Sequence, residues 1–160
     1  MKLKRTAVES AVQELAQGNA KILILDIETA PIAAAVGRIW QENVGLNMID
    51  RDWYILSFSA KWLGSNEVFY IDQRDVRDPE DDTRLLRELW KLLDQADFVV
   101  AHNGQRFDVR KIFSRMAIKG IHPPSPFQVI DTLIIAKRRF GFTSNKLEYL
   151  TKALCTDHKS

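Results

Sequence analysis

The chain has 160 residues, of which 46% are hydrophobic and 28% are charged, a composition typical of one globular domain and not of a disordered chain. Its single cysteine excludes an intrachain disulfide, and no apolar run approaches the roughly 20 residues that span a bilayer. We therefore expect one soluble cytoplasmic domain, residues 1–160, with no membrane partner.

Charge is distributed unevenly along the chain. Residues 1–102 carry 12 Lys/Arg and 17 Asp/Glu, whereas residues 103–160 carry 11 and 4. A basic surface that meets a polyanion would produce such a bias, and so would solvated helix faces. The bias alone leaves both interpretations open.

The first expected element is an N-terminal helix within residues 1–18. Gly18 follows a run of helical periodicity and is a suitable C-cap, so we expect a short amphipathic helix packed on the main body. Its apolar positions are Ala7, Val8, Ala11, Val12, Leu15 and Ala16. Residues 21–27 then form a short, almost wholly apolar run, which predicts a central strand buried on both faces.

The next elements are an irregular stretch and a hairpin. Residues 31–50 contain Pro31 and two glycines, which predicts mostly loop. Residues 53–62 and 67–71 predict two strands joined by a turn at residues 64–66. One face of the first of these strands carries Tyr54, Leu56, Phe58, Ala60 and Trp62.

The second half alternates helices and strands. Capping residues before position 84 predict a helix that buries Leu85, Leu86, Leu89, Trp90 and Leu93. A strand at 97–101 leads to a helix at 106–119 whose inward positions are Val109, Ile112, Phe113, Met116 and Ala117. A strand at 128–130, a helix near 132–140 and a helix from Asn145 follow. We therefore expect an α/β fold with a mixed central sheet, three strands and then alternating helix and strand, flanked by helices.

Two carboxylates lie at the end of the first strand. Period-2 alternation places Asp26 and Glu28 on the same side of the chain, with Ile27 on the other. Such a pair is costly unless a cation neutralises it, and Mg²⁺ prefers hard oxygen ligands of this kind. A fraying strand whose carboxylates are simply solvated is the alternative.

A second cluster lies at a predicted strand-to-helix junction, residues 102–108. Asn103 is a good N-cap, Gly104 permits a tight turn, and Phe107 anchors the new helix in the core. Asp108 falls in the first helical turn, where it complements the helix dipole. Because groups at the strand ends of an open α/β sheet converge, Asp108 can also meet Asp26 and Glu28.

Together these motifs resemble the first two motifs of the DEDD 3′→5′ exonucleases, the DnaQ-like enzymes of the ribonuclease H-like fold. The resemblance continues at residues 130–133 and 146–150, and residues 40–64 are similar to the subgroup found among phage and prokaryotic exonucleases. It covers about residues 21–155.

The resemblance implies a function and a set of site residues. Asp26, Glu28 and Asp108 would be the catalytic, metal-binding carboxylates of a nuclease that uses two Mg²⁺ or Mn²⁺ ions to hydrolyse nucleic-acid 3′ ends, with single-stranded DNA as the expected substrate. The substrate-binding residues would be Thr29, Ala30, Asn103 and Phe107. Asp131 is expected to be a structural partner and not a metal ligand.

The resemblance also implies a third motif, Tyr-x-x-x-Asp or His-x-x-x-x-Asp, which does not follow residue 150 in this chain. We expect a truncated form with impaired activity that holds one metal ion or none. A natural short form, a segment supplied by a partner and a degenerate domain are alternatives. The expected consequences are a possible homodimer through uncovered apolar surface or a non-catalytic nucleic-acid-binding module on the same fold.

Overall fold

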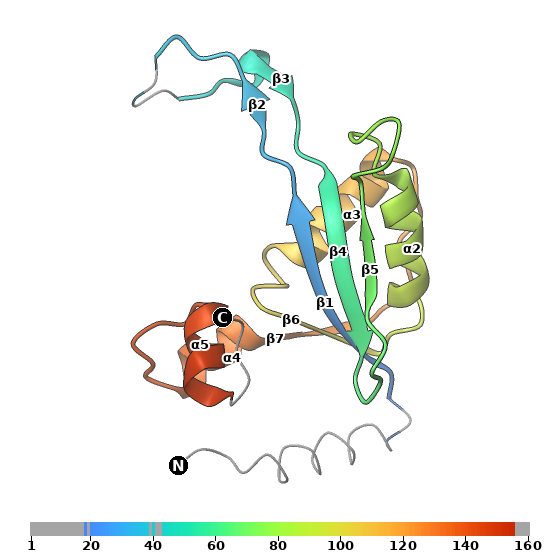
Figure 1. The fold of residues 1–160 in the computed structure, drawn as a ribbon, viewed down its shortest axis with the longest axis vertical. Helices are drawn as coiled ribbons and strands as arrows, with labels where there is room; N and C mark the ends of the chain where they lie inside the picture. The colour runs from blue at the N-terminus through green and yellow to red at the C-terminus, as the bar shows by residue number, and fades with distance from the viewer. Residues whose placement is uncertain (1–17, 19, 39, 41–42, 156–160) are drawn as a thin grey trace.

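The apolar run that begins near residue 21 forms the central strand of a five-stranded mixed sheet (Figure 1). The computed structural model describes residues 18, 20–38, 40 and 43–155, so the expected N-terminal helix lies outside the described residues. The strand order is β5-β4-β1-β6-β7, in which β4 is antiparallel to β1 and β5, and β6 is parallel to β1 and β7. The strands are β1 (Ile22–Thr29), β4 (Ile55–Trp62), β5 (Phe69–Asp72), β6 (Phe98–Ala101) and β7 (Gln128–Asp131).

The predicted hairpin is confirmed, because β4 and β5 pair antiparallel across a turn that contains Gly64, a residue with a positive φ of 84°. The stretch expected to be mostly loop is indeed largely irregular. It contains a small ribbon of β2 (Ala33–Ala34) and β3 (Ile49–Arg51), with the 3-10 turn η1 (Leu46–Met48). This ribbon projects from the end of the sheet at which β1 finishes (Figure 1).

The helices form two groups (Figure 1). The first group, α2 (Thr83–Leu93) and α3 (Asp108–Ile118), packs together against one face of the sheet. The second group, α4 (Thr132–Arg139) and α5 (Leu147–Leu154), follows β7 and lies apart from the first. Within the described part of the chain, no helix is long and apolar enough to cross a membrane.

The hydrophobic core lies between the sheet and the helices α2 and α3. From β1 it takes Leu23, Leu25 and Ile27, whereas the alternate residue Ile24 is 39% exposed. The expectation that β1 is buried on both faces is therefore wrong. In the described residues, α2 and α3 cover only the face that carries Leu23, and we call the opposite side the open face.

Helix α3 differs from its predicted inward face. Ile112 and Met116 are buried as expected, but Phe113 and Ala117 are exposed. The buried position is instead Arg115, which is 7% exposed. Arg115 is buried because its guanidinium binds a buried carboxylate on another element.

That anion is Asp82, which is fully buried at the start of α2. Its Oδ2 accepts bonds from Arg115 Nε at 2.7 Å and from the Ile55 backbone N–H at 3.0 Å. Its Oδ1 accepts a second guanidinium bond at 2.9 Å. A single ion pair therefore links α2, α3 and β4 at the edge of the core.

Candidate active site

The two carboxylates of β1 lie side by side on the open face of the sheet. Asp26 and Glu28 are both exposed, and Ile27 between them is buried in the core. In the antiparallel register Asp26 lies opposite Ser59 and Glu28 opposite Ser57. The alternation that predicted a shared side for the two carboxylates is confirmed.

Asp108 joins these residues from the start of α3. Its Oδ1 accepts a hydrogen bond from the backbone N–H of Ile27 at 3.1 Å, although 81 positions separate the two residues in sequence. Because Ile27 lies between Asp26 and Glu28, this bond places the Asp108 carboxylate at the same end of β1. Asp108 therefore reaches the end of β1, but the described carboxylates do not form a closed group of three.

Burial and neighbouring charge both act on this group. The pKa of Asp108 is raised to about 6, mainly by burial and to a smaller extent by the negative charges of Asp26 and Asp131, whereas the hydrogen bond from the Ile27 N–H opposes the rise. The pKa of Asp26 is also raised, because its carboxyl group is partly desolvated although the residue as a whole is exposed. The site therefore contains two carboxylates whose charged forms are poorly stabilised by the protein alone.

The loop between β6 and α3 sets the position of Asp108. Asn103 has a left-handed φ of 70°, and its backbone oxygen accepts bonds from the N–H groups of Arg106 and Phe107. The prediction that Asn103 is the N-cap of this helix is wrong, since α3 begins at Asp108 with Phe107 as the capping residue. An extra turn of chain between Asn103 and the helix accounts for the difference.

Gly104 is required in this loop by a close backbone approach. A Cβ at this position would lie 2.5 Å from the Cβ of Ala101, closer than real side chains come. We expect Gly104→Ala to lower the free energy of unfolding by about 1–3 kcal/mol, because the backbone must shift to relieve the overlap. Urea denaturation measures this loss. Gly141→Ala is the control, since its Cβ would meet nothing within 4 Å, and equal losses in both variants would contradict the assignment.

Asp131 is buried at the end of β7 and accepts four backbone hydrogen bonds. Its Oδ1 takes the N–H groups of Asn103, Leu133 and Ile134, and its Oδ2 takes that of Gln105. It therefore caps α4 and holds the 103–105 part of the loop with one carboxylate. This arrangement supports the expectation that Asp131 is a structural partner.

The residues expected to bind substrate occupy different environments. Thr29 is half-buried at the last position of β1, and Ala30 is buried, with its N–H donating to the Tyr54 oxygen at 2.8 Å. Asn103 is half-buried in the loop. Phe107 packs against the core beside Asp108, as expected of an anchor. All four flank the carboxylates in the chain, and their contact with a nucleotide remains a prediction.

The sequence interpretation missed the serines of β4. Ser57 and Ser59 are half-buried on the open face, directly across the strand pair from the two acids. The signal was present as a period-2 alternation of Ser57, Ser59 and Lys61 with apolar residues. It identifies a polar row beside the carboxylates only once the register of β1 and β4 is known.

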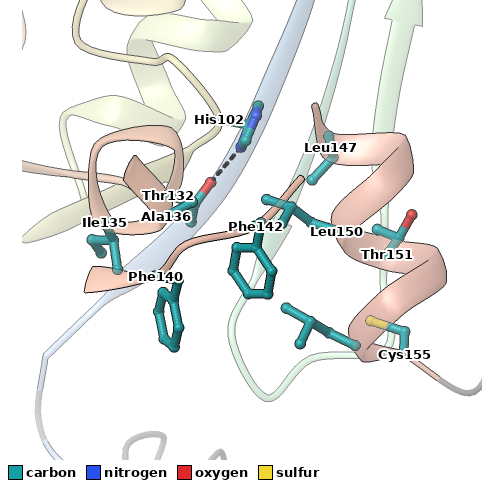
Figure 2. Close-up of a pocket in the computed structure, with 11 residues that line it drawn as sticks. His102, Thr132, Ile135, Ala136, Phe140, Phe142, Leu147, Leu150, Thr151 and Cys155 are labelled. Atoms are coloured by element: carbon teal, nitrogen blue, oxygen red, sulfur yellow. Dashed lines mark hydrogen bonds between the residues drawn. The ribbon is translucent and has the colours of Figure 1, made fainter. Parts of the chain in front are cut away.

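His102 lies next to this site and connects it to α5. One ring nitrogen, Nδ1, is 3.0 Å from the Thr132 hydroxyl, and Nε2 is 3.0 Å from the backbone oxygen of Asn145. Figure 2 shows the bond to Thr132 at the mouth of a pocket between α4 and α5. Both ring nitrogens are therefore engaged in contacts within the protein, which is typical of a structural histidine.

The donor chemistry of the site fits a hard divalent cation. Carboxylate oxygens are the ligands that Mg²⁺ and Mn²⁺ prefer, and a cation would offset the repulsion between Asp26 and Asp108. A closed cluster is not formed, since no three His, Cys, Asp or Glu side chains of the described residues are arranged to hold an ion. The structure therefore fits a cation held by the carboxylate pair, with Glu28 adjacent on the same strand face.

Comparisons with known proteins agree with the architecture. A family model of the RNase H superfamily matches residues 23–160, and no curated protein sequence matches the chain. Among solved structures, the family B DNA polymerase of the hyperthermophilic archaeon Pyrobaculum calidifontis is similar, with a TM-score of 0.65 and 12% identity. The match covers 87% of this chain and 19% of the polymerase chain. The mixed five-stranded sheet and the family match show that this chain belongs to the RNase H superfamily and has an RNase H-like nuclease fold.

Proposed function

We propose that the chain is a metal-dependent 3′→5′ exonuclease domain that hydrolyses phosphodiester bonds at the 3′ ends of single-stranded DNA. The observation that carries the proposal is the hydrogen bond from Ile27 to Asp108, which unites carboxylates from two distant segments. The resemblance to DEDD exonucleases at these same positions supports it. The DNA polymerase among the structural matches supports the fold.

The protein's own groups have separate roles in this proposal. Asp26 and Asp108 would hold the cation and, through it, the scissile phosphate at the end of β1. Glu28, which is exposed two residues further along the same face of β1, would be the third carboxylate that binds the cation, as the resemblance implies. The hydrogen bonds of the 103–107 loop would keep Asp108 within reach of Asp26 when substrate leaves.

Mg²⁺ or Mn²⁺ bound by these carboxylates would supply a Lewis acid and lower the pKa of a bound water, which is the chemistry that phosphodiester hydrolysis needs. The complete site of the family would hold two ions. With the carboxylates that this chain contributes from β1 and α3, we propose a single ion at most.

A nuclease assay tests this proposal. Single-stranded DNA labelled at its 5′ end, incubated with the protein and Mn²⁺, is expected to give a ladder of products shortened one nucleotide at a time. Asp26→Asn removes one negative ligand and is expected to reduce the ladder to background. Glu67→Gln, an exposed acid in the β4–β5 turn purified in parallel, is expected to leave it unchanged.

Two outcomes would contradict the proposed exonuclease activity. Equal laddering by the wild type and Asp26→Asn would identify a contaminating nuclease. Release of the 5′ label in short fragments from the start would show cleavage of another polarity. Chelation with EDTA is expected to stop the reaction in the wild type.

A non-catalytic nucleic-acid-binding module is the second candidate function. It is favoured by the lack of a closed three-residue cation cluster in the described residues and by the basic C-terminal part of the chain. Such a module would bind single-stranded DNA equally well with Mn²⁺ and with EDTA, and its affinity would fall steeply with salt. Binding that requires the metal would reject this candidate.

A further inference from the structure

The last turn of α4 carries a cluster of exposed cations. Lys137, Arg138 and Arg139 form this turn, and all three residues are exposed. Within the described part of the chain, none of the three forms an ion pair with a carboxylate. The C-terminus of a helix is equivalent to about half a negative charge, so three cations leave a local excess of positive charge.

An aromatic pair follows this basic turn. The rings of Phe140 and Phe142 are stacked, with their centroids 5.1 Å apart and their planes at 26°. Phe140 is nevertheless 57% exposed, although phenylalanine is among the residues that folding most often buries. Figure 2 shows both rings on the α4 side of a pocket between α4 and α5, which has a volume of about 280 Å³ and an almost wholly apolar lining. The cations therefore lie next to an accessible aromatic surface.

Helix α5 adds positive charge from the other side of this pocket. Lys146 immediately precedes the helix and is exposed, and the acid of its first turn, Glu148, is bound by Lys152 at 2.7 Å. Residues 132–155 together carry five Lys/Arg and one Glu. We define the basic–aromatic surface as Lys137, Arg138, Arg139, Phe140, Phe142 and Lys146.

One short helix connects the basic–aromatic surface to the candidate active site. Helix α4 begins directly after Asp131, whose charge acts on Asp108, and its eight residues span about 12 Å. Successive phosphates of one stacked DNA strand are about 3.4 Å apart, so this distance corresponds to about three or four nucleotides. A strand whose 3′ end lies at the carboxylates can therefore reach the surface within a few nucleotides.

We propose that the basic–aromatic surface binds single-stranded nucleic acid a few nucleotides before the 3′ end, with phosphates on the cations and a base stacked on Phe140. The position of the 3′ end in this inference rests on the proposed exonuclease function. Single-stranded nucleic acid uses both chemistries of the surface, because cations neutralise its phosphates and aromatic rings stack on its bases. A second copy of the chain fits less well, since a two-fold contact through this surface would bring like charges together.

Binding measured without metal tests the cations. Fluorescence anisotropy of a labelled single-stranded DNA of about ten nucleotides, titrated with the full chain in EDTA, gives the Kd at several salt concentrations. Arg138→Gln combined with Arg139→Gln is expected to weaken binding about tenfold. The slope of log K against log salt should become shallower by about 1.4, because each phosphate contact to a single strand contributes about 0.7.

A matched pair of arginines provides the control. Arg77→Gln combined with Arg87→Gln removes the same charge from exposed positions elsewhere, and is expected to leave the affinity and the slope close to those of the wild type. Equal effects of the two double variants would overturn the proposal, and so would a wild type that does not bind the DNA.

A further variant tests the stacking. Phe140→Leu keeps an apolar side chain but removes the aromatic face, and is expected to weaken binding about fivefold with no change in the salt slope. Tyr70→Leu, at a comparably exposed aromatic residue of β5, is expected to have no effect. An affinity unchanged by Phe140→Leu would contradict the proposal. Sedimentation that shows a dimer in the wild type and a monomer in Phe140→Leu would assign the surface to a second copy and also overturn it.

This inference and the proposed exonuclease activity can fail separately. Binding in EDTA needs no catalysis, so a loss of affinity confined to the Arg138/Arg139 variant supports the surface even if labelled DNA gives no ladder of products. A ladder that forms at the same rate in the wild type and in this variant, at limiting protein concentration, would support the exonuclease and overturn the surface.

Discussion

Asp108→Asn is expected to raise the stability of the protein at neutral pH while abolishing nuclease activity. The asparagine Oδ1 can still accept the Ile27 hydrogen bond, but the variant carries no buried charge at this position. It also removes the repulsion between Asp108 and Asp26. We expect a gain of about 1–3 kcal/mol in the free energy of unfolding at pH 7.5.

The gain should depend on pH in a defined direction. The folded-state pKa of Asp108 is about 6, above the ordinary value of 3.8 expected in the unfolded chain, so the folded protein binds the proton more tightly. The destabilisation by Asp108 is therefore fully present above about pH 6, decreases as the pH falls from 6 towards 3.8, and is absent below 3.8. The advantage of Asp108→Asn is expected to follow the same course.

Urea denaturation of the wild type and Asp108→Asn at pH 7.5 and pH 4.5 measures the free energy of unfolding and so tests both expectations. Asp75→Asn, which changes an exposed aspartate, is the control. A variant no more stable than wild type at pH 7.5, or a gain that is identical at both pH values, would contradict the origin proposed for the pKa shift. Mn²⁺ provides a second readout. It is expected to raise the Tm of the wild type and to have a much smaller effect on Asp108→Asn, because binding to the folded state stabilises it.

Arg115→Met is expected to cause the largest loss of stability. It leaves Asp82 fully buried with a charge that no guanidinium neutralises, and unpaired buried charges of this kind cost about 3–5 kcal/mol. The methionine keeps much of the side-chain volume, so the loss reports the charge and its hydrogen bonds more than a cavity. Thermal and urea denaturation measure it.

Two further variants isolate this effect. Arg110→Met changes an exposed arginine on the same helix and is expected to be nearly neutral. Combining Asp82→Asn with Arg115→Met removes both charges and retains an acceptor for the Ile55 N–H, so the double variant is expected to be more stable than Arg115→Met alone. A double variant that is as unstable as the single one would show that packing, and not the buried charge, dominates.

The sequence was informative where local patterns decide the structure. The β4–β5 hairpin, the leucine face of α2 and the shared side of Asp26 and Glu28 depend on turn residues and on side-chain periodicity, and each is present as expected. The approach of Asp108 to the end of β1 followed from the general topology of α/β sheets.

The errors concern properties set by partners that are distant in sequence. An apolar run such as β1 indicates a central strand, but it cannot show whether one or both faces are covered. The buried position of Arg115 depends on Asp82, 33 residues earlier, and no local pattern reveals such a pair. The left-handed backbone of Asn103 depends on the N–H that it gives to Asp131 from the neighbouring strand, so its local capping propensity was misleading.

The four bonds that Asp131 accepts have a consequence for the dynamics of the site. The amides of Asn103 and Gln105 share an acceptor side chain with those of Leu133 and Ile134, so a rotation of this side chain releases both groups together. The loop that positions Asp108 and the start of α4 therefore form one cooperative unit of local unfolding. We expect movements of α4 to reach the Asp108 loop through the Asp131 side chain, alongside the contacts of His102 with Thr132 and Asn145.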